Sequence, residues 1–96
     1  MTETFRYPTP NLIESSAGYL VEILGPSRVR YTEASRALTI PSELLLGARP
    51  FVLYASAIRA WDPPHEREQI DAARRAEIVE AIRRAVRAKG YEIEVD

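Results

Sequence analysis

Hydrophobic and polar residues alternate along three short segments of the chain, which is the pattern of strands that bury one face. The segments are residues 19–24, 28–33 and 36–40. Between the last two, Ala34 and Ser35 leave room only for a hairpin loop, of two residues or of four. Either loop places Glu33 opposite Arg36, where an ion pair is plausible. The side chains expected to face inward are Tyr19, Val21, Ile23, Val29, Tyr31, Leu38 and Ile40.

A continuous apolar run follows at Phe51–Tyr54, and it is typical of a strand buried on both faces. The chain then passes Trp61 and reaches Pro63 and Pro64, where neither a helix nor a strand ladder can continue. A single tryptophan at the end of a sheet is usually a core residue. The alternative is a partly exposed anchor at a binding interface, because tryptophan is common at such positions.

The second half of the chain predicts one long helix and a last strand. Asp71 is a suitable N-cap, apolar residues recur at helical spacing from Ile78, and Gly90 follows as the left-handed residue after the helix. Residues 91–96 alternate again, with Tyr91, Ile93 and Val95 expected inward. Earlier in the chain, residues 41–47 are interpreted as one short helical turn.

Together these elements predict an α+β domain. We expect a small antiparallel sheet of about five strands with the long C-terminal helix packed on one face, followed by a terminal strand. Residues 1–11, which contain Pro8 and Pro10, are interpreted as a flexible tail. The remaining residues, 12–96, are expected to form a single domain.

Composition narrows the possible compartments and partners. The chain has 96 residues, a formal net charge of −1 and no cysteine, so disulfides and thiolate metal sites are excluded. The near-neutral charge disfavours nucleic-acid binding. No secretory signal or membrane-spanning segment is recognisable, so we expect a soluble cytoplasmic protein without membrane contacts.

No group of residues predicts catalysis or a cofactor. The serines lack the context of an activated nucleophile, and the four glycines are too scattered for a phosphate loop. His65 with Asp62, Glu66 and Glu68 could be imagined as metal ligands. A solvated polar loop is the better interpretation, since Arg67 would repel a cation. We therefore expect no catalytic site, no metal and no cofactor.

A set of spaced residues resembles the immunity protein 74 family (Imm74), over about residues 18–95. Its most specific part is the strand that leads to Trp61, Pro63 and Pro64, followed by a helix and a last strand. The resemblance implies a bacterial protein of polymorphic toxin systems that binds a cognate toxin domain and blocks it, and that is not an enzyme. The residues that carry it are Tyr31, Glu33, Arg36, Leu38, Ile40, Glu43, Leu45, Phe51–Tyr54, Ile58, Trp61, Pro63, Pro64, Ile78, Ile82 and Gly90.

Our first functional hypothesis is therefore an immunity protein that neutralises its toxin by stoichiometric occlusion. The second is a small non-enzymatic interaction or regulatory module that dimerises through a sheet edge; an enzyme or RNA binder is a more distant third. Charged residues at the hairpin tip and in the loop before the helix are the candidate partner-binding residues, because exposed loops commonly carry contacts. They are Glu33, Arg36, Arg59, Asp62, Glu66 and Glu68.

Overall fold

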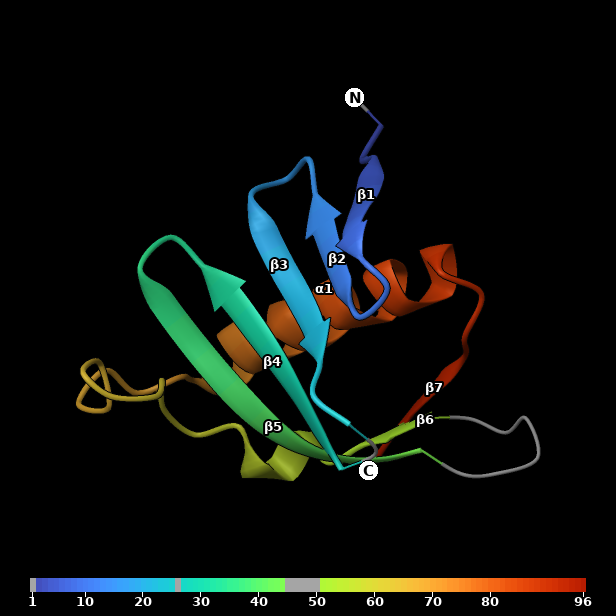
Figure 1. The fold of residues 1–96 in the computed structure, drawn as a ribbon. Helices are drawn as coiled ribbons and strands as arrows, with labels where there is room; N and C mark the ends of the chain where they lie inside the picture. The colour runs from blue at the N-terminus through green and yellow to red at the C-terminus, as the bar shows by residue number, and fades with distance from the viewer. Residues whose placement is uncertain (1, 26, 45–50) are drawn as a thin grey trace.

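The computed structural model describes residues 2–25, 27–44 and 51–96. These residues form one seven-stranded sheet in which the strands lie in the same order as in the chain (Figure 1). Neighbours from β1 to β6 are antiparallel, and β6 and β7 are parallel. The elements are β1 (Phe5–Thr9), β2 (Leu12–Ser15), β3 (Tyr19–Ile23), β4 (Arg28–Glu33), β5 (Arg36–Leu44), β6 (Phe51–Leu53), the 3-10 helix η1 (Ala55–Ala57), α1 (Ala72–Ala88) and β7 (Ile93–Val95).

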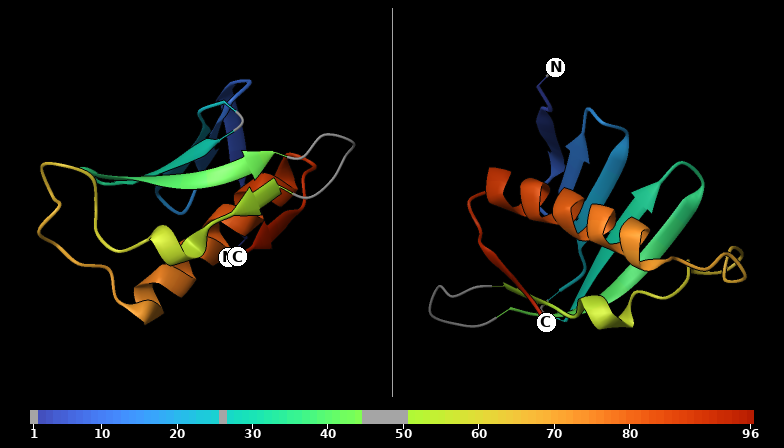
Figure 2. Two further views of the ribbon diagram at one scale, coloured as in Figure 1. Left: turned by 90° about the horizontal axis from the view of Figure 1, so that it is seen from below. Right: turned by 180° about the vertical axis from the view of Figure 1, so that it is seen from behind.

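Helix α1 covers one face of the sheet, and no helix of the described residues lies on the opposite face (Figure 1). The two further views show that the sheet curls, so that β6 and β7 lie close to the level of the helix (Figure 2). A parallel neighbour requires a crossover connection, and α1 supplies it between β6 and β7. The α+β class and the helix on one face are confirmed.

The core lies between α1 and the inward side chains of the sheet. The inward alternation predicted for β3, β4 and β5 is confirmed, with Ile23 only half-buried. Trp61 is also a core residue, 7% exposed, and its ring centroid lies 6.3 Å from that of Tyr31, which stacks on Tyr19 at 5.5 Å. The helix contributes the buried residues Ile78, Val79, Ala81, Ile82, Ala85 and Val86.

Local chemistry sets both ends of α1, as the sequence predicts. The Asp71 carboxylate accepts a hydrogen bond from the Arg74 backbone N–H at 2.8 Å, which caps the first turn. At the other end Gly90 has a φ of +99°, and the N–H of Tyr91 donates to the carbonyl of Val86. That bond closes a Schellman motif and turns the chain back towards β7.

Three expectations for the strands are wrong. The sheet has seven strands rather than about five. Residues 5–9 of the expected tail form β1, because Pro8 lies in an edge strand where a missing N–H costs no ladder bond. In the segment 41–47, Pro41–Leu44 continues β5 instead of starting a helical turn, and residues 45–47 lie outside the described residues.

The turn at residues 34 and 35 and the last strand need smaller corrections. The hairpin loop has two residues, and Ala34 adopts a φ of +53°, which favours glycine. In the last strand only Ile93 is buried, at 6% exposed. Tyr91, which precedes β7, and Val95 are 46% and 40% exposed.

Candidate functional site

The structure brings the tip of the β4–β5 hairpin and the segment before α1 to the same end of the molecule (Figure 1). We call residues 33–37 together with residues 59–69 the hairpin–loop end. It contains all six candidate partner-binding residues, including Glu33 and Arg36. The contact is built on the backbone, since the N–H of Asp62 donates to the carbonyl of Ala37 at 2.8 Å.

Arg36 and Glu68 form the most direct link between the two segments. The Nη2 atom of Arg36 lies 2.6 Å from Oε1 of Glu68, and Nδ1 of His65 lies 3.0 Å from Oε2 of the same carboxylate. The Arg36 hydrogen bond is the main cause of a lowered pKa at Glu68. Both side chains are more than one-third exposed, so the pair leaves charge accessible to a partner.

Glu33 pairs with the helix rather than with Arg36. Its carboxylate accepts a hydrogen bond from the Tyr31 hydroxyl at 2.7 Å and another from the guanidinium of Arg74. Burial opposes ionisation, but these donors outweigh it and lower the pKa of Glu33. Glu33 and Arg36 are opposite each other in the ladder, as expected. The ion pair is not formed because each residue has a partner on another element.

Asp62 bonds to the first part of β5, which extends beyond the residues that pair with β6. Its carboxylate accepts from the Thr39 hydroxyl at 2.6 Å and from the Thr39 N–H at 3.2 Å. With the Asp62 N–H bonded to Ala37, this residue supplies contacts that a neighbouring strand would otherwise make. Asp62 therefore holds the hairpin–loop end together.

Arg59 and Glu66 line a hollow of about 350 Å³ on the same end. The hollow is closed at its base by a bridge between Ala60 and Gln69, and Ile70 donates its N–H to the carbonyl of Arg59 at 2.8 Å. Among the residues that the structure describes, neither Arg59 nor Glu66 has an ion-pair partner. Both side chains are exposed and available for opposite charges on another protein.

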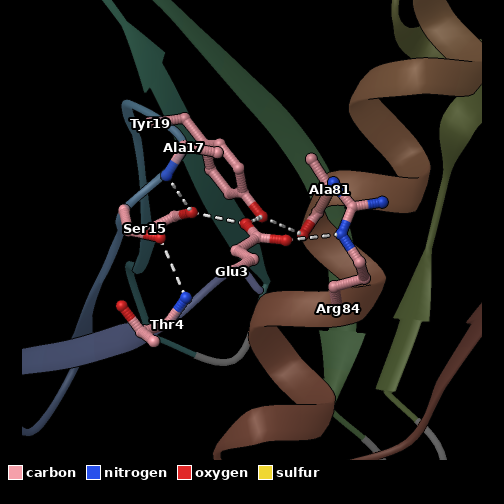
Figure 3. Close-up of polar contacts among 8 residues, drawn as sticks. Glu3, Thr4, Ser15, Ala17, Tyr19, Ala81 and Arg84 are labelled. Carbon is pink, nitrogen blue, oxygen red and sulfur yellow. Dashed lines mark hydrogen bonds and ion pairs between the residues drawn. The ribbon is translucent and has the colours of Figure 1, made fainter. Parts of the chain in front are cut away.

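A second cluster, centred on Glu3, repeats the arrangement of Tyr31, Glu33 and Arg74 further along the helix (Figure 3). The Glu3 carboxylate accepts from the Tyr19 hydroxyl at 2.5 Å, from Nε of Arg84 at 2.8 Å and from the Ser15 hydroxyl. Burial opposes ionisation, yet these donors lower the pKa of Glu3. Burial is also the main cause that raises the pKa of Tyr19, to about 12.

A groove of about 270 Å³ lies between the two tyrosine–glutamate–arginine clusters. Sequence reasoning missed it, because its walls come from the β2–β3 turn, the sheet and α1. The lining residues from α1 are spaced three or four positions apart, so they share one face of the helix. This spacing was the only feature of the sequence that could have indicated the groove. The lining residues are Ala17, Gly18, Tyr19, Tyr31, Glu33, Arg74, Glu77, Ala81 and Arg84.

In the described ranges, no group of three or more His, Asp or Glu residues could hold a metal ion. The two tyrosines of the groove donate to carboxylates, Tyr31 to Glu33 and Tyr19 to Glu3, and these bonds favour the neutral form of the tyrosines and the ionised form of the carboxylates. No helix in the described part of the chain is long and apolar enough to cross a membrane.

The fold is that of a small α+β protein, and its hairpin–loop end is charged and held together by contacts between the two segments. A family model, immunity protein 74, matches residues 21–96, so the chain belongs to the Imm74 family. The family resemblance noted in the sequence is thereby confirmed. Comparison with curated proteins finds no match, and comparison with solved structures finds none either.

Proposed function

We propose that this protein is an immunity protein that binds a cognate bacterial toxin domain and neutralises it by stoichiometric occlusion in the cytoplasm. The observation that carries the proposal is membership of the Imm74 family across residues 21–96. Under this proposal the protein acts as a non-enzymatic inhibitor that binds neither nucleic acid nor membrane and needs no cofactor.

We further propose that the toxin contacts the hairpin–loop end. The six candidate partner-binding residues there have three different roles. Glu33, Arg36 and Glu68 are partly exposed but already paired within the protein, and they present a fixed pattern of charge. Arg59 and Glu66 are exposed without ion-pair partners in the described residues and are the strongest candidates for direct pairing. Asp62 supports the surface through Thr39.

Co-expression with the toxin domain encoded beside this gene tests the function. We expect growth to be rescued and an equimolar complex to be isolated. If the toxin remains lethal and no complex forms, the immunity proposal is wrong. An inactive toxin variant allows the affinity to be measured separately from survival.

Charge reversals test the location of the contact. Arg59→Glu and Glu66→Arg should each weaken toxin binding about tenfold, with little change in stability because no internal ion pair is broken. Arg28→Glu is the matched control, since Arg28 is exposed at the other end of β4. If only the control variant loses binding, the hairpin–loop end is not the interface, although the immunity function stands.

Reversal of Glu33 and Glu68 together is also expected to weaken toxin binding. Both carboxylates have arginine partners within the protein, so the double reversal could also lower stability. Stability must be measured on the same variant, and only a loss of affinity in a folded protein counts. Unchanged affinity would remove both residues from the proposed interface.

A dimerising interaction module is the second candidate, because β1 and β7 are the outermost strands of the described sheet. Strand edges with unpaired N–H and C=O groups can pair with another chain. The molar mass in solution separates the two candidates. A monomer over the concentration range of the assay would reject the dimerising module.

A further inference from the structure

The two outer edges of the sheet differ in how well they are protected against pairing. At β1, Pro8 removes one N–H group, and the ladder with β2 shifts register between Arg6 and Thr9. Prolines and irregularities of this kind block the addition of another strand. Strand β7, at the opposite edge, contains neither a proline nor a register shift in its ladder with β6.

The backbone of β7 presents hydrogen-bonding groups outward. The N–H of Asp96 donates to the carbonyl of Leu53 at 2.9 Å, and the carbonyl of Asp96 accepts from Ala55 at 3.0 Å. Because successive residues of a strand direct these groups to opposite sides, the N–H and C=O of Val95 point away from β6. Those of Ile93 do the same, but its carbonyl already accepts a hydrogen bond from Nη1 of Arg83 at 3.4 Å.

The side chains around this edge are acidic on one face and apolar on the other. Glu94 and Asp96 are exposed and alternate with the buried Ile93, so they lie on the face turned away from the helix. Glu92 is also exposed but pairs with Arg87 of α1 at 3.3 Å. Tyr91 and Val95, on the helix side, are two of the three exposed large hydrophobic residues in the described chain. An exposed strand edge flanked by apolar side chains is a pairing surface.

These charges disfavour antiparallel pairing of β7 with β7 of a second copy of the chain. An antiparallel copy centred on Ile93, Glu94 or Val95 would place Glu94 opposite Glu92, Glu94 or Asp96, respectively. Like charges directly opposite each other are destabilising in a sheet. The same positions would stabilise lysine or arginine on the added strand, while its alternate residues would contact Val95 and Tyr91.

We propose that the outer edge of β7 binds an extended segment of another protein, in which basic and apolar residues alternate, as an additional strand. Backbone hydrogen bonds to the N–H of Ile93 and to the N–H and carbonyl of Val95 supply the pairing, and the acidic face selects the basic sequence. This surface lies on the other side of the molecule from the hairpin–loop end (Figure 1). The proposal does not depend on the toxin-binding function.

A titration of the isotope-labelled full chain with a blocked peptide of alternating lysine and valine tests this inference. We expect saturable shifts of the backbone signals of Ile93 and Val95 and slower hydrogen exchange at the Val95 N–H. The matching peptide of alternating glutamate and valine should bind at least about tenfold more weakly. Absence of saturable binding, or equal binding of both peptides, would overturn the proposal.

Two variants separate strand pairing from simple charge attraction. Val95→Pro removes an outward N–H without removing a bond to β6, so the fold should persist while peptide affinity falls about tenfold. Val95→Ala keeps the N–H and should retain affinity within about threefold. Glu94→Lys, at an exposed position, should also weaken binding of the basic peptide about tenfold. Equal affinity of the proline and alanine variants, or an unaffected lysine variant, refutes the assignment.

Discussion

Replacement of Glu3 by glutamine is the sharpest test of how the N-terminal segment is held. The carboxylate accepts three side-chain hydrogen bonds, from Ser15, Tyr19 and Arg84. A hydrogen bond to a charged group contributes about 1.5–3 kcal/mol, against about 1 kcal/mol for a neutral one. Arg84 is half exposed, and its contribution is small because solvent screens it.

We therefore expect Glu3→Gln to lower the free energy of unfolding by about 2 kcal/mol at neutral pH. For a domain of this size, that loss lowers the melting temperature by about 10 °C. Urea denaturation of both proteins measures the difference. In a double-mutant cycle, Tyr19→Phe should show a coupling of about 1 kcal/mol with Glu3→Gln, because the two groups share one hydrogen bond.

The effect of pH provides an independent check on the same residue. Because the pKa of Glu3 is lowered by folding, its stabilisation is complete above the unfolded pKa of about 4.3. It is lost as the pH falls through the folded pKa, so the gap between the wild type and Glu3→Gln should close in acid. Glu14→Gln is the control, since that carboxylate is 40% exposed and has one weak partner. If Glu3→Gln matches this control at neutral pH, the segment is not held as described.

The remaining predictions concern the hairpin and the buried hydroxyls. Ala34→Gly should stabilise the protein by about 0.5–1 kcal/mol in urea denaturation, because φ is +53° there. The same change in the helix, Ala76→Gly, should cost about 1 kcal/mol, and a loss at both positions would contradict the turn geometry. Asp62→Ala should cost about 1–2 kcal/mol and increase hydrogen exchange along β5; unchanged exchange would show that Asp62 does not hold the edge. Burial raises the pKa of Tyr19 to about 12 and that of Tyr31 further, so in an absorbance titration both should ionise late. Stability should then fall as the pH rises above about 10, where the unfolded chain loses these protons first.

Local patterns in the sequence were sufficient to predict the central strands of the sheet and the helix. Alternation predicted β3, β4 and the first part of β5, and capping chemistry predicted α1 from Asp71 to Gly90. In each case the residues that predict the element lie within it or directly beside it. The family resemblance also rests on this part of the chain, and its outcome is the match over residues 21–96.

The parts that the sequence did not predict depend on distant residues. Strand β1 has no clear alternation, and Pro8 argues against a strand until its place at the sheet edge is known. Glu3 and Arg84 are 81 residues apart, so no local pattern relates them. Likewise, the pairing of Glu33 with Arg74 rather than Arg36 is decided by how the helix packs. Candidate contact residues can therefore be chosen from their positions in loops. The partners of these residues within the protein cannot be predicted from the sequence.

The agreement between strand order and chain order has a consequence for how the protein folds during synthesis. Each hairpin up to β6 can pair as soon as its second strand leaves the ribosome, since every loop to be closed is short. The apolar face that includes Val21 and Ile40 then stays exposed to solvent until α1 has been made. We therefore expect the growing chain to pass through an uncovered sheet and to be most prone to aggregation until α1 has left the ribosome.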